Sequence, residues 1–172
     1  MKLNFKKGLI VGVVLAISFL VIGDFYLDSI SEKAEQVASL DVNTLEYRNL
    51  NDEVVKLSDV SEDKNVFINY WATWCKPCLE EFPLMDEVAN KAEDDFVFIV
   101  VSSESIEKIK KFSRKKDYNF IYLQTESILS KGINPIPQSF ILDKEMIVKK
   151  HHPGPIEGSA NQVADSLKIW VQ

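Results

Sequence analysis

Both cysteines of the 172-residue chain stand in one short segment, WCKPC at positions 74–78, at a boundary between two hydrophobic patterns. Residues 66–71 form a short apolar run that predicts a buried strand, and residues 76–92 have the spacing of a helix. A separation of three positions puts both sulfur atoms on one face of the first helical turn, close enough for a disulfide. Two cysteines are too few for a disulfide scaffold or a four-thiolate zinc site. The sequence therefore predicts a reversible Cys75–Cys78 bond.

The other hydrophobic patterns predict an α/β fold, a mixed sheet covered by helices. Strand and helix patterns alternate after residue 66, and a hairpin follows around residues 143–144. Another hairpin is predicted around residues 51–52, and Ser159 opens the last helix with a capping-box spacing to Gln162. The predicted strands are 44–50, 53–57, 66–71, 96–101, 119–123, 139–142 and 146–150, and the predicted helices are 29–40, 76–92, 104–116, 126–131 and the segment from 159.

The N-terminal segment carries the membrane signal of the chain. Lys2, Lys6 and Lys7 precede an uncharged run over residues 8–23, and with residues 25–27 the apolar stretch reaches about 20 residues, enough to cross a bilayer. The residues that follow lack the small-residue pattern of a cleavage site, which favours an uncleaved anchor over a removed signal peptide. The lysines place the N-terminus in the cytoplasm and the remainder outside. We expect a cytoplasmic tip and anchor at 1–28, a stalk helix or linker at 29–41 and one domain at 42–172.

Charge is distributed unevenly along the chain. The net charge of −6 combines 20 basic with 26 acidic residues, and without the three N-terminal lysines the remainder carries −9. An acidic domain argues against nucleic-acid binding, which needs excess Lys and Arg to displace counterions from phosphates. Residues 108–116 hold six basic side chains. We interpret this run as a solvated helix face, and contact with anionic lipid or an acidic partner is the alternative.

The two cysteines are expected to play different chemical roles. Cys75 stands at a helix N-terminus, where free amide N–H groups and the helix dipole favour the thiolate, so it is the predicted nucleophile. Cys78 lies one turn further on and is the predicted resolving thiol. The alternatives are a structural disulfide and half of a metal site, to which only His151 and His152 could add ligands. Neighbouring strand residues point to opposite faces, so these histidines are not expected to ligate one ion together.

Two stretches, VFINYWATWCKPCLEEFP at 66–83 and IPQSFILD at 136–143, resemble a family of membrane-anchored thiol-disulfide oxidoreductases, the thioredoxin-like TlpA, ResA and DsbE-like group. The resemblance extends from about residue 42 to the C-terminus. It implies a thioredoxin-like fold with an N-terminal hairpin and a cis proline facing the disulfide. It also implies a role in reducing apocytochrome c or another exported substrate. By this resemblance Pro137 is the cis proline, and Ile136 offers its backbone to the substrate chain.

The thiol of Cys78, the inner of the two cysteines, needs a group that accepts its proton. Asn69 stands where thioredoxins proper carry a buried acid, so another carboxylate must serve, or none does. Glu81 is three positions after Cys78 and shares its helix face, and related proteins have an acid there. We expect Glu81 to exchange the proton of Cys78, and a solvated surface acid is the alternative. Of the two tryptophans beside the turn, Trp71 is expected to pack and Trp74 to cover the thiols in part.

The sequence thus predicts an anchored, extracytoplasmic thiol-disulfide oxidoreductase. No cofactor is expected beyond the redox-active Cys75–Cys78 pair. The expected partners are the membrane, a disulfide-bearing exported protein and a membrane electron donor that reduces the resulting disulfide. The rival from another class is a non-catalytic carrier of Cu(I) that uses the two thiols and a histidine. Within the enzyme class, an oxidase and a peroxidase remain alternatives.

Overall fold

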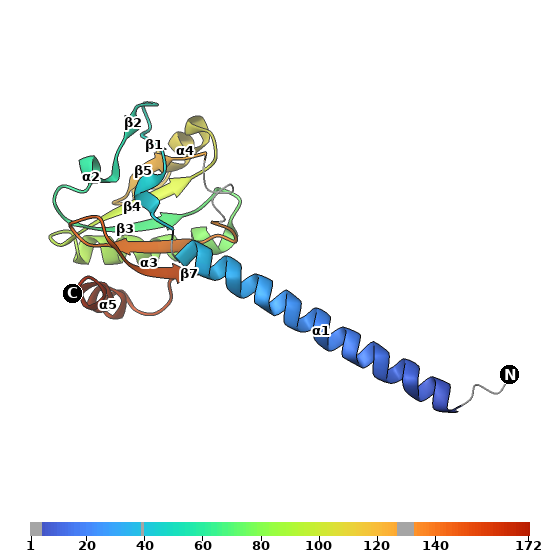
Figure 1. The fold of residues 1–172 in the computed structure, drawn as a ribbon. Helices are drawn as coiled ribbons and strands as arrows, with labels where there is room; N and C mark the ends of the chain where they lie inside the picture. Colours follow the sequence, from blue (N-terminus) through green and yellow to red (C-terminus); the bar gives the residue numbers. More distant parts are fainter. Residues whose placement is uncertain (1–4, 39, 127–132) are drawn as a thin grey trace. The chain divides into compact units, whose positions relative to one another are not determined.

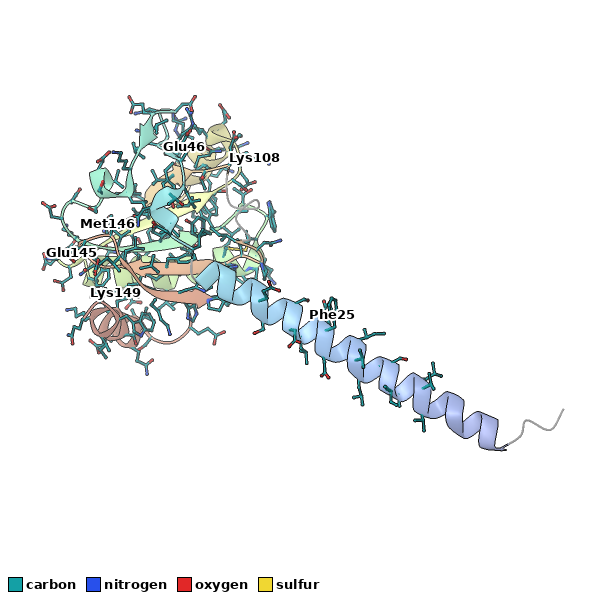
Figure 2. The ribbon with its side chains drawn as sticks, in the orientation of Figure 1. Phe25, Glu46, Lys108, Glu145, Met146 and Lys149 are labelled. Carbon is teal, nitrogen blue, oxygen red and sulfur yellow. A yellow bond between two sulfur atoms is a disulfide. The ribbon has the colours of Figure 1, made fainter. Side chains whose placement is uncertain are left out.

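The computed structural model describes residues 5–38, 40–126 and 133–172, and the chain divides into two compact units, residues 1–39 and 40–172, each described by itself. The described residues of the first unit form one helix, α1 (Phe5–Ala38). Its segment Gly12–Ser29 has a mean hydropathy of 1.6 and no residue buried inside the protein, so it is long and apolar enough to cross a membrane. Phe25 projects from this segment into the surroundings (Figure 2).

The expected stalk over residues 29–40 is the continuation of this same helix as far as Ala38. The apolar residues Ile30, Ala34 and Val37 have the spacing of one helix face in this stretch, and their side chains lie outside the described residues.

The second unit is built on a seven-stranded mixed sheet in the order β2-β1-β5-β4-β3-β6-β7 (Figure 1). The central strand β3 pairs parallel with β4, which pairs parallel with β5, whereas β3–β6, β6–β7, β5–β1 and β1–β2 are antiparallel. The strands are β1 (Tyr47–Arg48), β2 (Val54–Val55), β3 (Asn65–Tyr70), β4 (Phe96–Ser102), β5 (Ile121–Gln124), β6 (Gln138–Leu142) and β7 (Val148–Pro153). Every residue of β3 and β4 is buried, as expected for central parallel strands.

The helices confirm most of the predicted pattern. Ser159 caps α5 through the expected reciprocal bonds with Gln162. The helix predicted over residues 104–116 is shorter, because the backbone of Ser105 is extended at its N-terminal end and the helix ends at Ser113. The helix predicted over 126–131 reaches into residues outside those described. The helical elements of the domain are η1 (Val42–Thr44), α2 (Leu57–Val60), α3 (Lys76–Lys91), α4 (Ile106–Ser113) and α5 (Ala160–Trp170).

The N-terminal part of the domain differs most from the prediction. The hairpin around residues 51–52 is present, but its strands shrink to two residues each, and Asp52 occupies the left-handed region with φ 67°. Leu57, predicted to end a strand, instead begins the short helix α2, where it is buried. Two-residue strands bury too little side chain to leave a clear alternating pattern, so sequence alone overestimated their length.

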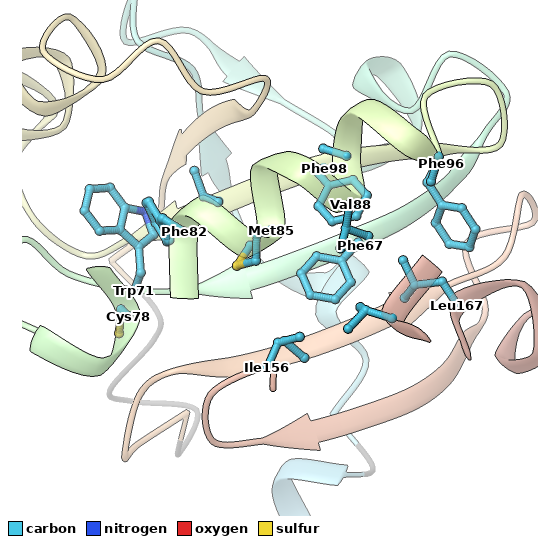
Figure 3. Packing of buried hydrophobic residues seen from close by; sticks show 14 of the residues in the cluster. Phe67, Trp71, Cys78, Phe82, Met85, Val88, Phe96, Phe98, Ile156 and Leu167 are labelled. Carbon is cyan, nitrogen blue, oxygen red and sulfur yellow. The ribbon is translucent and has the colours of Figure 1, made fainter. Parts of the chain in front are cut away.

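The main core lies between the sheet and the helices α3 and α5, which pack against each other (Figure 1). Phe67 and Phe98 stack at 4.8 Å between ring centroids, and Phe82, Met85 and Leu167 are fully or almost fully buried in the same cluster (Figure 3). Cys78 belongs to this cluster too. The core thus reaches the first turn of α3, so the cysteine pair is built on a rigid support.

Candidate active site

The turn between β3 and α3 fixes the two cysteines. The Trp71 amide donates to the Val101 carbonyl at 2.9 Å, which holds the end of β3 on β4, and the Cys75 amide donates to Ala72 at 3.0 Å. Cys75 is the N-cap of α3, and its sulfur accepts a bond from the Cys78 amide at 3.3 Å. The predicted place of Cys75 at the helix N-terminus is confirmed. In the reduced form, amide groups at a helix N-terminus favour a thiolate at this position.

The structure shows the oxidised form of the pair. A disulfide joins Cys75 to Cys78, whose Cα atoms are 5.4 Å apart. Cys78 is completely buried, whereas Cys75 keeps 4% of its surface exposed. Of the two sulfur-bearing residues, only Cys75 therefore touches solvent, which is the order of access that a nucleophile and a resolving thiol require.

A loop with two cis prolines lies against the outer cysteine. The Ile136–Pro137 peptide bond is cis, as the resemblance implies, and the Ile136 carbonyl oxygen is 3.8 Å from the Cys75 sulfur. The Gly154 amide donates to the Pro137 carbonyl at 3.0 Å. The Asn134–Pro135 bond is also cis, which sequence analysis missed, because a proline in a loop leaves no local signal of its isomer.

Glu81 is a buried acid, so the alternative of a solvated surface position is wrong. Its side chain projects from α3 into the domain, and the residue is only 4% exposed. Its two carboxylate oxygens accept bonds from the Asn69 amide at 2.9 Å and from the Ile156 backbone amide at 2.6 Å. Burial raises the pKa of Glu81 to about 7, against the lowering effect of these two donors. This carboxyl can therefore hold or release a proton near neutral pH.

Asn69 connects Glu81 to the strand on its other side. Its side-chain nitrogen donates both to Glu81 and to the Ser139 hydroxyl of β6, at 2.9 and 3.0 Å. The residue is completely buried. An uncharged donor at this position stabilises a neighbouring carboxylate, whereas an acid here would repel it.

The two tryptophans beside the turn have opposite environments. Trp71 is 1% exposed and packs on the ring of Phe82, with 5.1 Å between ring centroids, as predicted (Figure 3). It also packs on the ring of Phe112, at 4.6 Å. Trp74 is 72% exposed. It adjoins Cys75 in sequence, and its cover over the thiols stays a prediction.

Glu104 is a site residue that sequence analysis missed. One of its carboxylate oxygens accepts from the Thr73 amide at 2.6 Å and the other from the Thr73 hydroxyl at 2.8 Å, so it holds the turn two residues before Cys75. Lys108 pairs with the same carboxylate at 3.4 Å. Thr73 and Glu104 are 31 positions apart, and a single acid after a strand gives no signal of such a contact.

The two histidines are engaged separately. The ring nitrogen Nε2 of His151 bonds to the Gln138 side chain at 2.9 Å, and Nε2 of His152 lies 3.3 Å from the Pro155 carbonyl. Among residues 12–29, 31–32, 40–126 and 133–172, whose side chains the structure describes, His, Cys, Asp and Glu form no group of three or more that could hold a metal ion.

Comparisons with known proteins find a matching family and similar oxidoreductases. A family model described as AhpC/TSA matches residues 34–151. The thiol-disulfide oxidoreductase ResA of Bacillus thuringiensis is 34% identical over 119 residues, which cover 66% of this chain and 67% of the relative. The thioredoxin-like protein YneN of Bacillus subtilis is 33% identical over 117 residues, or 62% of this chain and 66% of the relative.

Solved structures share the domain's architecture. The crystal structure of the exposed lipoprotein thioredoxin Etrx1 from Streptococcus pneumoniae matches with a TM-score of 0.59 and 30% identity. The match covers 72% of this chain and 97% of that one. The predicted thioredoxin-like fold is confirmed.

Proposed function

The chain belongs to the AhpC/TSA family of thioredoxin-like proteins and is a thiol-disulfide oxidoreductase, and from this premise we propose that it reduces disulfides of exported proteins outside the cytoplasm. The observation that carries the proposal is the position of the Cys75 sulfur. It lies at the N-terminus of α3 and 3.8 Å from the backbone of the cis-proline loop, where a substrate chain can reach it.

In the first step the Cys75 thiolate attacks one sulfur of a substrate disulfide. The new bond joins Cys75 to that sulfur, the substrate S–S bond breaks, and the other substrate sulfur leaves as a thiolate that takes up a proton. The amide of Cys78 and the helix N-terminus stabilise the attacking thiolate before the reaction. Ile136 and Pro137 supply the backbone that holds the substrate chain beside the sulfur, and Trp74 adds exposed apolar surface.

In the second step the Cys78 thiolate attacks the Cys75 sulfur. The Cys75–Cys78 disulfide forms, and the second substrate sulfur leaves, so the substrate has gained two electrons and two protons. Glu81 accepts the proton that the Cys78 thiol must lose, because its pKa of about 7 leaves the carboxyl partly ionised at neutral pH. A membrane protein with a dithiol then returns the pair to the reduced form.

The helix α1 tethers the domain to the membrane. Its apolar segment Gly12–Ser29 follows lysines, so the positive-inside rule puts the domain on the outer face. Disulfides persist in that compartment, where cytosolic glutathione and thioredoxin do not operate. Exported proteins that need free thiols, such as apocytochrome c before haem attachment, are the substrate class that this arrangement suits.

Insulin reduction with dithiothreitol as the electron donor tests the proposal. The wild-type protein in detergent should accelerate the reaction above background, and Cys75→Ser should return the rate to background. A wild-type rate equal to that of Cys75→Ser would overturn the proposal.

Trapping in cells identifies the substrate. A Cys78→Ala variant cannot resolve the mixed disulfide, so Cys75 should remain bonded to its partners, which mass spectrometry identifies after non-reducing purification. Recovery of apocytochrome c would assign the protein to cytochrome maturation, and recovery of many unrelated exported proteins would assign a general reductase. A Cys75→Ser/Cys78→Ala double variant is the control for non-covalent binding.

A further inference from the structure

Gln138 links the cis-proline loop to the neighbouring strand. It follows Pro137 directly at the start of β6, and its residue is 4% exposed. Its side-chain nitrogen donates to the Pro135 carbonyl at 2.7 Å, and its side-chain oxygen lies 2.9 Å from Nε2 of His151. The side-chain amide of Gln138 therefore links the loop that contacts Cys75 to the adjacent strand β7.

His151 is held firmly in its place on β7. It pairs opposite Phe140 in the sheet, and the two rings stack with centroids 4.6 Å apart and planes inclined by 25°. Because the nitrogen of Gln138 is committed to Pro135, its oxygen faces His151, so Nε2 of His151 carries the hydrogen and donates. The Nε2 hydrogen is present in both the neutral and the charged ring, so this bond does not depend on the protonation of His151.

We propose that His151 and Gln138 are positioning residues that fix the segment from Pro135 to Pro137 for the binding of a polypeptide substrate. The proposal rests on the proposed function, in which Ile136 and Pro137 hold the substrate chain. The chain of bonds runs from His151 Nε2 to Gln138 and on to Pro135, and it ends one residue from the Ile136 carbonyl that lies 3.8 Å from the Cys75 sulfur. A looser segment presents a less ordered backbone to the substrate, whereas the sulfur itself keeps its helix-terminal environment.

The structure offers a matched pair of variants. His151→Phe keeps a ring that can stack on Phe140 but removes the donor to Gln138. His152→Phe makes the same chemical change one residue away, where the ring nitrogen lies near the Pro155 carbonyl instead. Gln138→Met keeps the length of the side chain and removes both bonds of its amide.

The test compares two substrates of the full-length protein in detergent, insulin and hydroxyethyl disulfide, which has no peptide backbone. His151→Phe should raise the KM for insulin about fivefold and leave kcat within about twofold, as the loss of one hydrogen bond implies. Gln138→Met should raise this KM further. The rates with hydroxyethyl disulfide, and all rates of His152→Phe, should stay at the wild-type level.

A second readout is independent of turnover. The backbone amide resonance of Ile136 in the NMR spectrum should shift or broaden in His151→Phe and remain unchanged in His152→Phe. An unchanged Ile136 resonance, an unchanged insulin KM, or an equal loss with both substrates would overturn the positioning role. Failure of the proposed function has a different signature, because the wild-type protein itself would then not exceed Cys75→Ser on insulin.

Discussion

The inner and outer sides of the Cys75–Cys78 pair differ in how deeply their residues are buried. On the inner side, Cys78, Glu81 and Asn69 are buried, and the bonds of Glu81 go to other buried groups. On the outer side, Trp74 is largely exposed, and the Ile136 carbonyl lies 3.8 Å from the sulfur of Cys75, the cysteine that keeps some exposed surface. In the proposed mechanism, the proton of Cys78 is therefore transferred at buried groups, and the exchange of disulfide bonds takes place on the exposed side.

This difference in burial allows one helix to carry the groups proposed for proton transfer and those proposed for disulfide exchange. The first turn of α3 presents Cys75 at its end and Cys78 one turn inward, and Glu81 follows a further turn along the same face. Cys78 and Glu81 are both buried on this face, and burial raises the pKa of the Glu81 carboxyl. Substitutions on the inner side should therefore change stability and pH dependence, and those on the outer side should change substrate binding.

The largest expected effect on stability is that of replacing Trp71, which is buried on the inner side. Trp71→Ala should lower the free energy of unfolding by about 3–5 kcal/mol, because it leaves a cavity among the rings of Phe82, Phe112 and Tyr122. Urea unfolding of the full-length protein in detergent, followed by circular dichroism, measures the change. A loss below about 1 kcal/mol would contradict the tight packing of this side.

Glu81→Gln should remove a pH dependence of stability. The pKa of Glu81 is raised from 4.5 to about 7, so the native state binds this proton more tightly than the unfolded chain. The resulting stability is complete below pH 4.5 and is lost as the pH rises through 7. At 1.36 kcal/mol per pKa unit, the wild-type protein should lose about 3 kcal/mol relative to Glu81→Gln over this window.

The same variant tests the proton transfer. The wild-type rate of closing the mixed disulfide should rise with an inflection near pH 7, and Glu81→Gln should lack that inflection. Glu80→Gln is the matched control, because Glu80 adjoins Glu81 in sequence but forms an exposed ion pair with Lys76. An inflection that survives in Glu81→Gln would assign the proton to another group.

The parts of this site that could be predicted from sequence are those set by local spacing. The cysteine pair, the helix N-terminus at Cys75 and the common face of Cys78 and Glu81 all follow from positions within two helical turns. The hydrogen bond from the Ile156 amide to Glu81 could not be predicted, because Ile156 is 75 positions away in a loop before α5. The bond between Thr73 and Glu104 joins two loops in the same way.

Prediction of the fold from sequence has the same limit, because it depends on local patterns. The fully buried strands β3 and β4 have strong apolar runs and were predicted to within one residue of their ends. The hairpin of β1 and β2 is held partly by side-chain bonds of Asn49, whose oxygen accepts from the amides of Asn51 and Glu53. Bonds of this kind do not follow a hydrophobic period, so the sequence predicted the turn and overestimated the strands.

Asn69→Ala should move the titration of Glu81 upward. The variant removes a donor to the carboxylate, and hydrogen bonds to a charged group favour its ionised form, so the pKa of Glu81 should rise by about one unit. A carboxyl titration followed by NMR measures it. Ser139→Ala is the control, because it removes the other acceptor of Asn69 and leaves the bond to Glu81 in place. A fall of the pKa in Asn69→Ala would contradict this role.

The smallest effect on stability is expected at Trp74, the outer counterpart of Trp71. Trp74 is 72% exposed, so Trp74→Ala should change the free energy of unfolding by no more than about 0.5 kcal/mol. Its indole offers apolar surface to a docking chain, so the KM for insulin should rise a few-fold while the rate with hydroxyethyl disulfide stays unchanged. A stability loss close to that of Trp71→Ala would remove the distinction between the two sides. An unchanged KM would restrict the substrate surface to the cis-proline loop.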